Sequence, residues 1–211
     1  MSDCCENKRC EVTALRERHA RVLWIVLFVN AAMFFIEGLA GLAAHSTSLL
    51  ADALDMLGDA LVYGASLFVL ARSIRWQATA ALTKGIFMLI FGVGVLFEAA
   101  MKITYPIMPD VGLMGVVGGL ALIANFGCFL LLYRHRGDNL NMSSTWLCSR
   151  NDLIANVGVL AAATASAFLG SRWPDILVGV LIAGLFLRSA GHVVCAALRE
   201  LHQPPISAAN R

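Results

Sequence analysis

Two pairs of side chains in this sequence could bind a metal, and each pair is spaced four residues apart inside an apolar stretch. Asp55 and Asp59 form the first pair, and Cys148 and Asp152 form the second. Side chains four residues apart lie on one face of an α-helix, one above the other. The spacing therefore predicts two helices that each present two ligands and that together could enclose one cation with four ligands.

The three aspartates are costly in an apolar setting. An aspartate at the centre of a bilayer costs roughly 2.5–3.5 kcal/mol, so three left unpaired would cost about 8–10 kcal/mol. Ionisable residues inside a membrane commonly mark ion pathways and binding sites. A transported cation is the simplest partner that would offset this cost.

The composition indicates an integral membrane protein. Of the 211 residues, 59% are hydrophobic and 14% are charged, and the mean hydropathy is +0.74. A soluble domain has about 25% charged residues. A transmembrane helix needs ~20 apolar residues, so the chain has room for about six spans and for no soluble domain of ~100 residues beside them. No P-loop, GxSxG or HExxH motif is present, so we expect neither an enzyme nor a bound cofactor.

Six apolar segments separated by polar loops predict an all-α, integral membrane fold of six transmembrane helices. We expect a cytoplasmic N-terminal tail with a cysteine cluster over residues 1–21, a six-helix domain over 22–198 and a short cytoplasmic tail over 199–211. The predicted spans run over residues 22–42, 49–71, 76–103, 111–133, 143–169 and 174–198.

The charge of the loops predicts the orientation, because cytoplasmic loops are rich in Lys and Arg. Lys102 and Arg172 fall on one side of the predicted membrane, and the other loop and tail cations fall on the opposite side. We therefore expect a multi-pass protein of the cell (inner) membrane with both termini in the cytoplasm. Glu37 and Arg150 fall inside spans, where we expect each to pair with a buried carboxylate or with each other; the alternative is that they line a water-filled cavity.

The two ligand pairs are predicted to meet near the middle of the bilayer. At 1.5 Å per residue, Asp59 lies about 16 Å from the outer edge and Asp152 about 13 Å from the inner edge of a core roughly 30 Å thick. The second and fifth segments run in opposite directions, so contact between them would bring all four ligands to one depth. Secondary transporters use binding sites at this depth.

Three carboxylates and one thiolate suggest which ion would bind. Zinc accepts sulfur and oxygen ligands, and cadmium and lead also suit the thiolate of Cys148. Alternatively, Cys148 is only a small buried hydrophobic residue. Asp52 is either a further acceptor or proton carrier beside the site or a carboxylate in the first helical turn. Asn156 is either a fifth ligand or the donor of a helix–helix hydrogen bond.

These residues resemble the cation diffusion facilitator family over roughly residues 24–198. Residues 45–59 (His-Ser-Thr-Ser-Leu-Leu-Ala-Asp-Ala-Leu-Asp-Met-Leu-Gly-Asp) look like the second helix of that family, and residues 148–157 (Cys-Ser-Arg-Asn-Asp-Leu-Ile-Ala-Asn-Val) resemble its fifth helix. The resemblance implies export of divalent metals from the cytoplasm against protons, by a protein that is usually a dimer.

The sequence departs from the family pattern in three places. Asp55 stands where zinc-type members have His, which matches another branch of the family. Cys148 stands where the fifth helix usually has His or Asp, and this favours thiophilic ions. The sequence also stops at Arg211, so we expect a short form without the family's cytosolic domain.

We therefore predict a proton-coupled efflux transporter for a divalent cation of the zinc, cadmium or lead type. Its expected partners are the metal ion, protons, the lipid bilayer and a second copy of the chain, and no nucleic acid. Two alternatives remain open. One is a passive cation channel. The other is a metal sensor or accessory subunit without flux, for which the tail cysteines Cys4, Cys5 and Cys10 would offer soft ligands.

Overall fold

The computed structural model describes residues 3–68, 74–134 and 140–202, and in these ranges the chain forms six α-helices and no strand. This confirms the predicted all-α bundle of six helices. The helices are α1 (Asp3–Ala43), α2 (Thr47–Phe68), α3 (Ile74–Thr104), α4 (Val111–Tyr133), α5 (Leu140–Leu169) and α6 (Trp173–His202).

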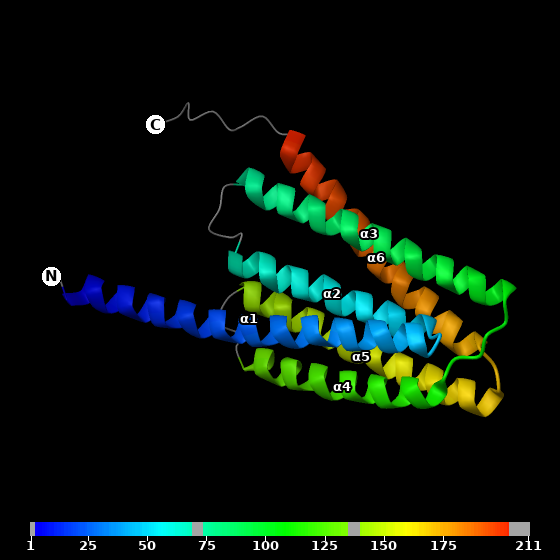
Figure 1. Ribbon diagram of the computed structural model, residues 1–211. Coiled ribbons are helices and arrows are strands. Elements are labelled where there is room, and N and C mark those ends of the chain that lie inside the picture. Colours follow the sequence, from blue (N-terminus) through cyan, green and yellow to red (C-terminus); the bar gives the residue numbers. More distant parts are fainter. Residues whose placement is uncertain (1–2, 69–73, 135–139, 203–211) are drawn as a thin grey trace.

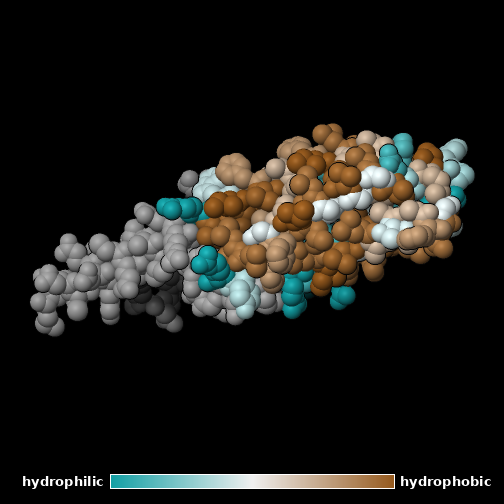
Figure 2. Space-filling view, turned by 90° about the horizontal axis from the view of Figure 1, so that it is seen from below, coloured by the Kyte–Doolittle hydropathy of each residue, from teal (hydrophilic) through white to brown (hydrophobic). Residues whose placement is uncertain are grey.

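Five of the described helices, all except α2, are long and apolar enough to cross a membrane. Helix α2 carries Asp52, Asp55 and Asp59 within 22 residues, and it therefore depends on its neighbours to bury its polar face. Large apolar side chains cover the outside of the bundle, among them Phe28, Phe35, Leu39, Val116 and Ile123, as the space-filling view shows for one face (Figure 2). Such a surface suits lipid rather than water, and the protein is a multi-pass membrane protein.

Helix α2 lies at the centre of the bundle and packs against α1, α3, α5 and α6. Helix α3 packs mainly on α6, and α4 mainly on α5 (Figure 1). Helix α1 begins, and α6 ends, at the same end of the bundle (Figure 1). This arrangement agrees with an even number of crossings. The opposite end holds the α1–α2 turn, and we call it the hairpin end.

Helix α1 begins much earlier than the first predicted span. It is helical from Asp3, whereas its apolar part runs over Ala20–Ala43, close to the predicted start at residue 22. The side chains of Cys4, Cys5 and Cys10 lie outside the part of the chain whose side chains the structure describes. The backbone turns sharply between α1 and α2 at His45, which has a φ of +50° in the left-handed region.

Candidate metal centre

The carboxyl groups of Asp59 on α2 and Asp152 on α5 are hydrogen-bonded to each other inside the bundle. Both residues are buried, with 8% and 3% of their surface exposed. The opposite direction of the two helices brings these residues, which are 93 positions apart in sequence, into contact. Two carboxylates in contact repel each other unless a proton or a cation lies between them, so this pair is a place where either could bind.

Asp55, one turn from Asp59 on α2, extends the negative charge of the pair. It is partly buried and lies within electrostatic range of Asp59 and Asp152. Among the side chains that the structure describes, no three His, Cys, Asp or Glu are gathered closely enough to hold one metal ion. In this arrangement Asp59 and Asp152 therefore meet as a pair, and Asp55 lies near them without joining a cluster of three among the described side chains.

The fourth predicted ligand, Cys148, lies in α5 one turn before Asp152, but its side chain is outside the described part of the chain. A different thiol lies near the pair. Cys128 of α4 is buried, with 4% of its surface exposed, and it is within electrostatic range of Asp152 and Asp59. It packs in one apolar cluster with Tyr63.

Tyr63 supplies a contact to the centre that was not predicted from the sequence. Its hydroxyl donates a hydrogen bond to Oδ2 of Asp59, one turn back on α2, and the residue is almost fully buried. The four-residue spacing from Asp59 is the signal that could have identified it. Lys84 of α3 lies within electrostatic range of Asp59, so a positive charge also faces the centre.

Asp52 and Asn156, the two further candidates, are joined to each other. Nδ2 of Asn156 on α5 donates to Oδ2 of Asp52 on α2 over 2.6 Å. Oδ1 of Asn156 accepts a hydrogen bond from Nδ2 of Asn125 on α4 over 2.9 Å. Asn156 thus makes helix–helix hydrogen bonds, one of the two roles considered for it, and Asp52 accepts one of them. Asn125, which was not predicted as a site residue, completes a bridge across three helices.

Glu37 of α1 departs from the expectation that it would pair. The residue is fully buried, and neither carboxylate oxygen has a hydrogen-bond partner among the described residues. It lies within electrostatic range of Asp52 and Asp55. Arg150, its suggested partner, is exposed on α5. Glu37 therefore adds a further acidic group to the interior beside the centre.

A family model described as the cation efflux transmembrane domain matches residues 23–202. The chain is similar to a cadmium, cobalt and zinc/H(+)-K(+) antiporter of Bacillus velezensis, with 28% identity over 86% of this chain and 62% of the relative. It is also similar to the zinc transporter ZitB of Escherichia coli, with 27% identity over 88% of this chain and 63% of the relative.

A third relative is the metal cation efflux system protein CzcD of Cupriavidus metallidurans, which is 30% identical over 77% of this chain and 55% of its own length. The chain therefore spans less than two thirds of the length of these curated relatives.

Proposed function

The chain belongs to the cation efflux family, and from this we propose that it exports a divalent heavy-metal cation from the cytoplasm in exchange for protons. The metal ion is the cargo, and Asp55, Asp59, Cys148 and Asp152 bind it near the midplane. One observation carries the proposal, namely the hydrogen bond between the carboxyl groups of Asp59 and Asp152. It places acidic groups from two helices in contact inside an apolar bundle.

The proposed coupling follows from the chemistry of that contact. Two carboxyl groups can share a hydrogen bond only when one of them holds a proton. A metal ion binds the deprotonated groups, so its arrival releases protons, and protons that enter from the other side displace it. The same oxygen atoms thus serve both ions in turn, and a proton gradient can drive the metal out.

The proposed metal preference rests on the ligand types and on the names of the relatives. A thiolate at Cys148 beside three carboxylates suits zinc, cadmium and lead better than manganese or magnesium. Two of the relatives are named for zinc, and one of these also for cadmium and cobalt. We propose cadmium or zinc as the transported ion.

We also propose that the protein works as a homodimer in the cell membrane with both termini in the cytoplasm. The positive charge of the predicted cytoplasmic loops supports this orientation. Light scattering of the detergent-solubilised protein would give the mass of the assembly. Protease treatment of right-side-out vesicles would test the orientation, because the tails should be protected there.

The test of the proposed function is metal flux in proteoliposomes with an imposed pH gradient. Zinc, cadmium, lead, cobalt and manganese are supplied in turn, and a metal-sensitive dye reports their movement across the membrane. We expect zinc or cadmium to move fastest when the compartment that receives the metal is acidic. A protonophore at zero membrane potential should slow this flux sharply.

Asp59→Asn should abolish the flux, whereas Glu200→Gln should not. Both variants change a carboxylate to an amide, but Glu200 is exposed near the end of α6. Flux that follows only the metal gradient would show that the protein is a channel and not an antiporter. Metal binding without any flux would show that the protein is a sensor or an accessory subunit.

A further inference from the structure

Asp175, in the first turn of α6, forms hydrogen bonds with the residues that begin α2, although the two helices are far apart in sequence. Its Oδ1 accepts hydrogen bonds from the backbone and hydroxyl of Ser48 and from the hydroxyl of Ser46, over 3.0, 2.6 and 2.7 Å. Its Oδ2 accepts from the backbone nitrogen of Thr47 over 2.9 Å. The first backbone N–H groups of a helix lack partners within that helix, and here a residue of another helix satisfies them.

Lys102, in the last turn of α3, brings a third helix to the same point. Its Nζ lies 2.6 Å from Oδ2 of Asp175, and the two side chains are only 2% and 0% exposed. The same Nζ donates to the backbone oxygen of His45 in the α1–α2 turn. We call Lys102, Asp175 and residues 46–48 the clasp.

The backbones of α2 and α6 are in direct contact at the clasp. A Cβ atom added at Gly179 of α6 would lie 2.6 Å from the carbonyl carbon of Thr47 and 2.7 Å from the nitrogen of Ser48. No side chain fits between these helices at this level. Asp55 and Asp59 lie further along the same helix, about 10 and 16 Å from Ser48 at 1.5 Å per residue. An ion leaving between α2 and α6 toward the hairpin end must therefore pass the clasp.

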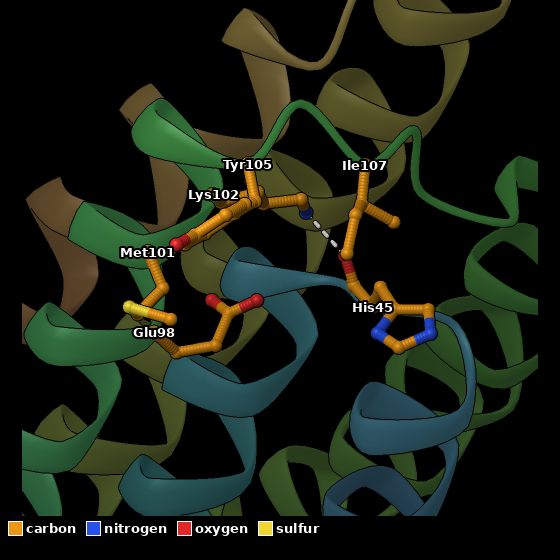
Figure 3. A pocket seen from close by; sticks show the side chains of 6 residues that line it. All are labelled: His45, Glu98, Met101, Lys102, Tyr105 and Ile107. Atoms are coloured by element: carbon orange, nitrogen blue, oxygen red, sulfur yellow. Dashed lines mark hydrogen bonds between the residues drawn. The ribbon is translucent and has the colours of Figure 1, made fainter.

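A hollow lies beside the clasp, because Lys102 belongs to the clasp and also lines the hollow. It is open on one side, has a volume of about 300 Å³ and is lined by His45, Glu98, Met101, Lys102, Tyr105 and Ile107. Figure 3 shows Lys102 crossing from α3 to the backbone of His45, with Glu98 one turn earlier on the same helix. Glu98 also accepts a hydrogen bond from the hydroxyl of Thr47 over 2.6 Å. Lys102 thus lines this hollow and at the same time contacts Asp175 in the clasp.

The chemistry of the clasp suits a contact that opens and closes. A buried ion pair contributes little net stability because the cost of removing both charges from water offsets their attraction. Water entering from the hollow could hydrate Lys102, Asp175 and the serine hydroxyls when they separate. An apolar contact of the same size would expose no groups that could form hydrogen bonds with water. The clasp is therefore a polar contact whose groups water can solvate when they separate, unlike the apolar core around Leu54 and Phe186.

We propose that Asp175 and Lys102 form the gate at the hairpin end and that they position α2 with its carboxylates. The closed clasp separates the carboxylates from the hollow, and its opening gives the bound ion a way out. This inference rests on the proposed transport function. Asp175 and Lys102 are positioning residues, because they act on the ion through α2 and do not bind it.

The backbone amides of Thr47 and Ser48 offer a direct readout, because Asp175 protects both from exchange with solvent. We would follow hydrogen exchange of the full chain in lipid nanodiscs by mass spectrometry, with and without Cd²⁺. We expect Cd²⁺ to speed exchange over residues 44–50, and Asp59→Asn to remove this response. Asp175→Asn should speed exchange there at least about tenfold even without Cd²⁺, which corresponds to about 1.4 kcal/mol of lost clasp stability.

Gly179→Ala is the second variant, because it separates α2 from α6 without altering a charge. It should also speed exchange over residues 44–50, whereas Gly184→Ala should not, since a Cβ at Gly184 meets nothing within 4 Å. In proteoliposomes, Asp175→Asn and Gly179→Ala should let Cd²⁺ leak down its own gradient without a pH gradient. A residue that only stabilises the fold would not produce such a leak.

The outcomes separate the gate from the transport function. If the unmodified protein transports Cd²⁺ but exchange over residues 44–50 does not respond to it, the gate is wrong and the transport function stands. If neither Asp175→Asn nor Gly179→Ala lets Cd²⁺ leak without a pH gradient, the proposed gate is wrong as well. If the unmodified protein neither binds nor moves Cd²⁺, the transport function fails and the gate fails with it.

Discussion

The amide nitrogen of Asn156 on α5 lies 2.6 Å from a carboxylate oxygen of Asp52 on α2. Both residues are fully buried, and Asn156 also accepts a hydrogen bond from Asn125 on α4. The bridge ties together the two helices that carry the candidate ligands, one turn from Asp55 and Asp152. It fixes how α2 and α5 are rotated toward each other, and so which of their side chains can meet.

Asn156→Ala should destabilise the bundle. The change removes both hydrogen bonds and leaves Oδ2 of Asp52 without its donor, at a cost of about 1–3 kcal/mol for a buried polar group. Thermal unfolding in detergent, followed by circular dichroism, would measure the loss. Asn151→Ala is the matched control, because Asn151 is exposed on the same helix. Equal shifts for the two variants would mean that the bridge carries no stability.

Asp55→Ala and Asp152→Ala should each abolish metal export and leave membrane insertion intact. Each variant loses one carboxylate of the candidate centre, and the remaining groups no longer neutralise a divalent ion. Flux in proteoliposomes and the amount of protein in the membrane fraction would be measured together. Export at the unmodified rate by either variant would exclude that residue from the centre.

Cys148→Ser should weaken the transport of cadmium and lead more than that of cobalt and manganese. The thiolate is the soft ligand of the proposed set, and thiolates favour soft ions. Competition assays with pairs of metals would give the change in selectivity. Cys195→Ser serves as the control, because Cys195 is a free and exposed thiol on α6. Equal losses for all four metals would leave Cys148 with a packing role.

Tyr63→Phe should lower the apparent affinity for metal by about tenfold or more. Outer groups that hydrogen-bond to ligands hold them in position, and their loss typically costs about 10–100-fold in metal affinity. The hydroxyl of Tyr63 is such a group for Asp59. Calorimetric titration with Cd²⁺ would measure the change, with Tyr133→Phe on the exposed end of α4 as the control. An unchanged affinity would show that Asp59 does not depend on this donor.

Metal affinity should rise with pH. The ligands must lose protons before they bind a divalent ion, so acid competes with the metal. If one proton leaves per bound ion, the dissociation constant should change about tenfold per pH unit. Titrations with Cd²⁺ between about pH 6 and about pH 8 would show this slope, and proton release can be measured in the same solutions by a pH indicator. A flat profile would argue against shared use of the carboxylates by protons and metal.

The sequence by itself determined the class of fold, and it also predicted which residues form the candidate centre. Apolar segments about one bilayer thick can only be helices in lipid, because their backbone groups have no other partners there. The four-residue spacing of Asp55 and Asp59 follows directly from helical geometry. Counting residues along antiparallel helices predicted a similar depth for Asp59 and Asp152, and in the structure their carboxyl groups are in contact.

The tertiary structure alone decided which residues from distant segments meet. Lys102 and Asp175 are 73 positions apart, and their pairing with residues 46–48 depends on how α2, α3 and α6 cross. Helix rotation likewise decides the bridge from Asn125 through Asn156 to Asp52. It also leaves Glu37 without a hydrogen-bond partner among the described residues. Periodicity in a sequence fixes which face of a helix is polar, whereas the neighbour that this face contacts is set by packing against the whole bundle.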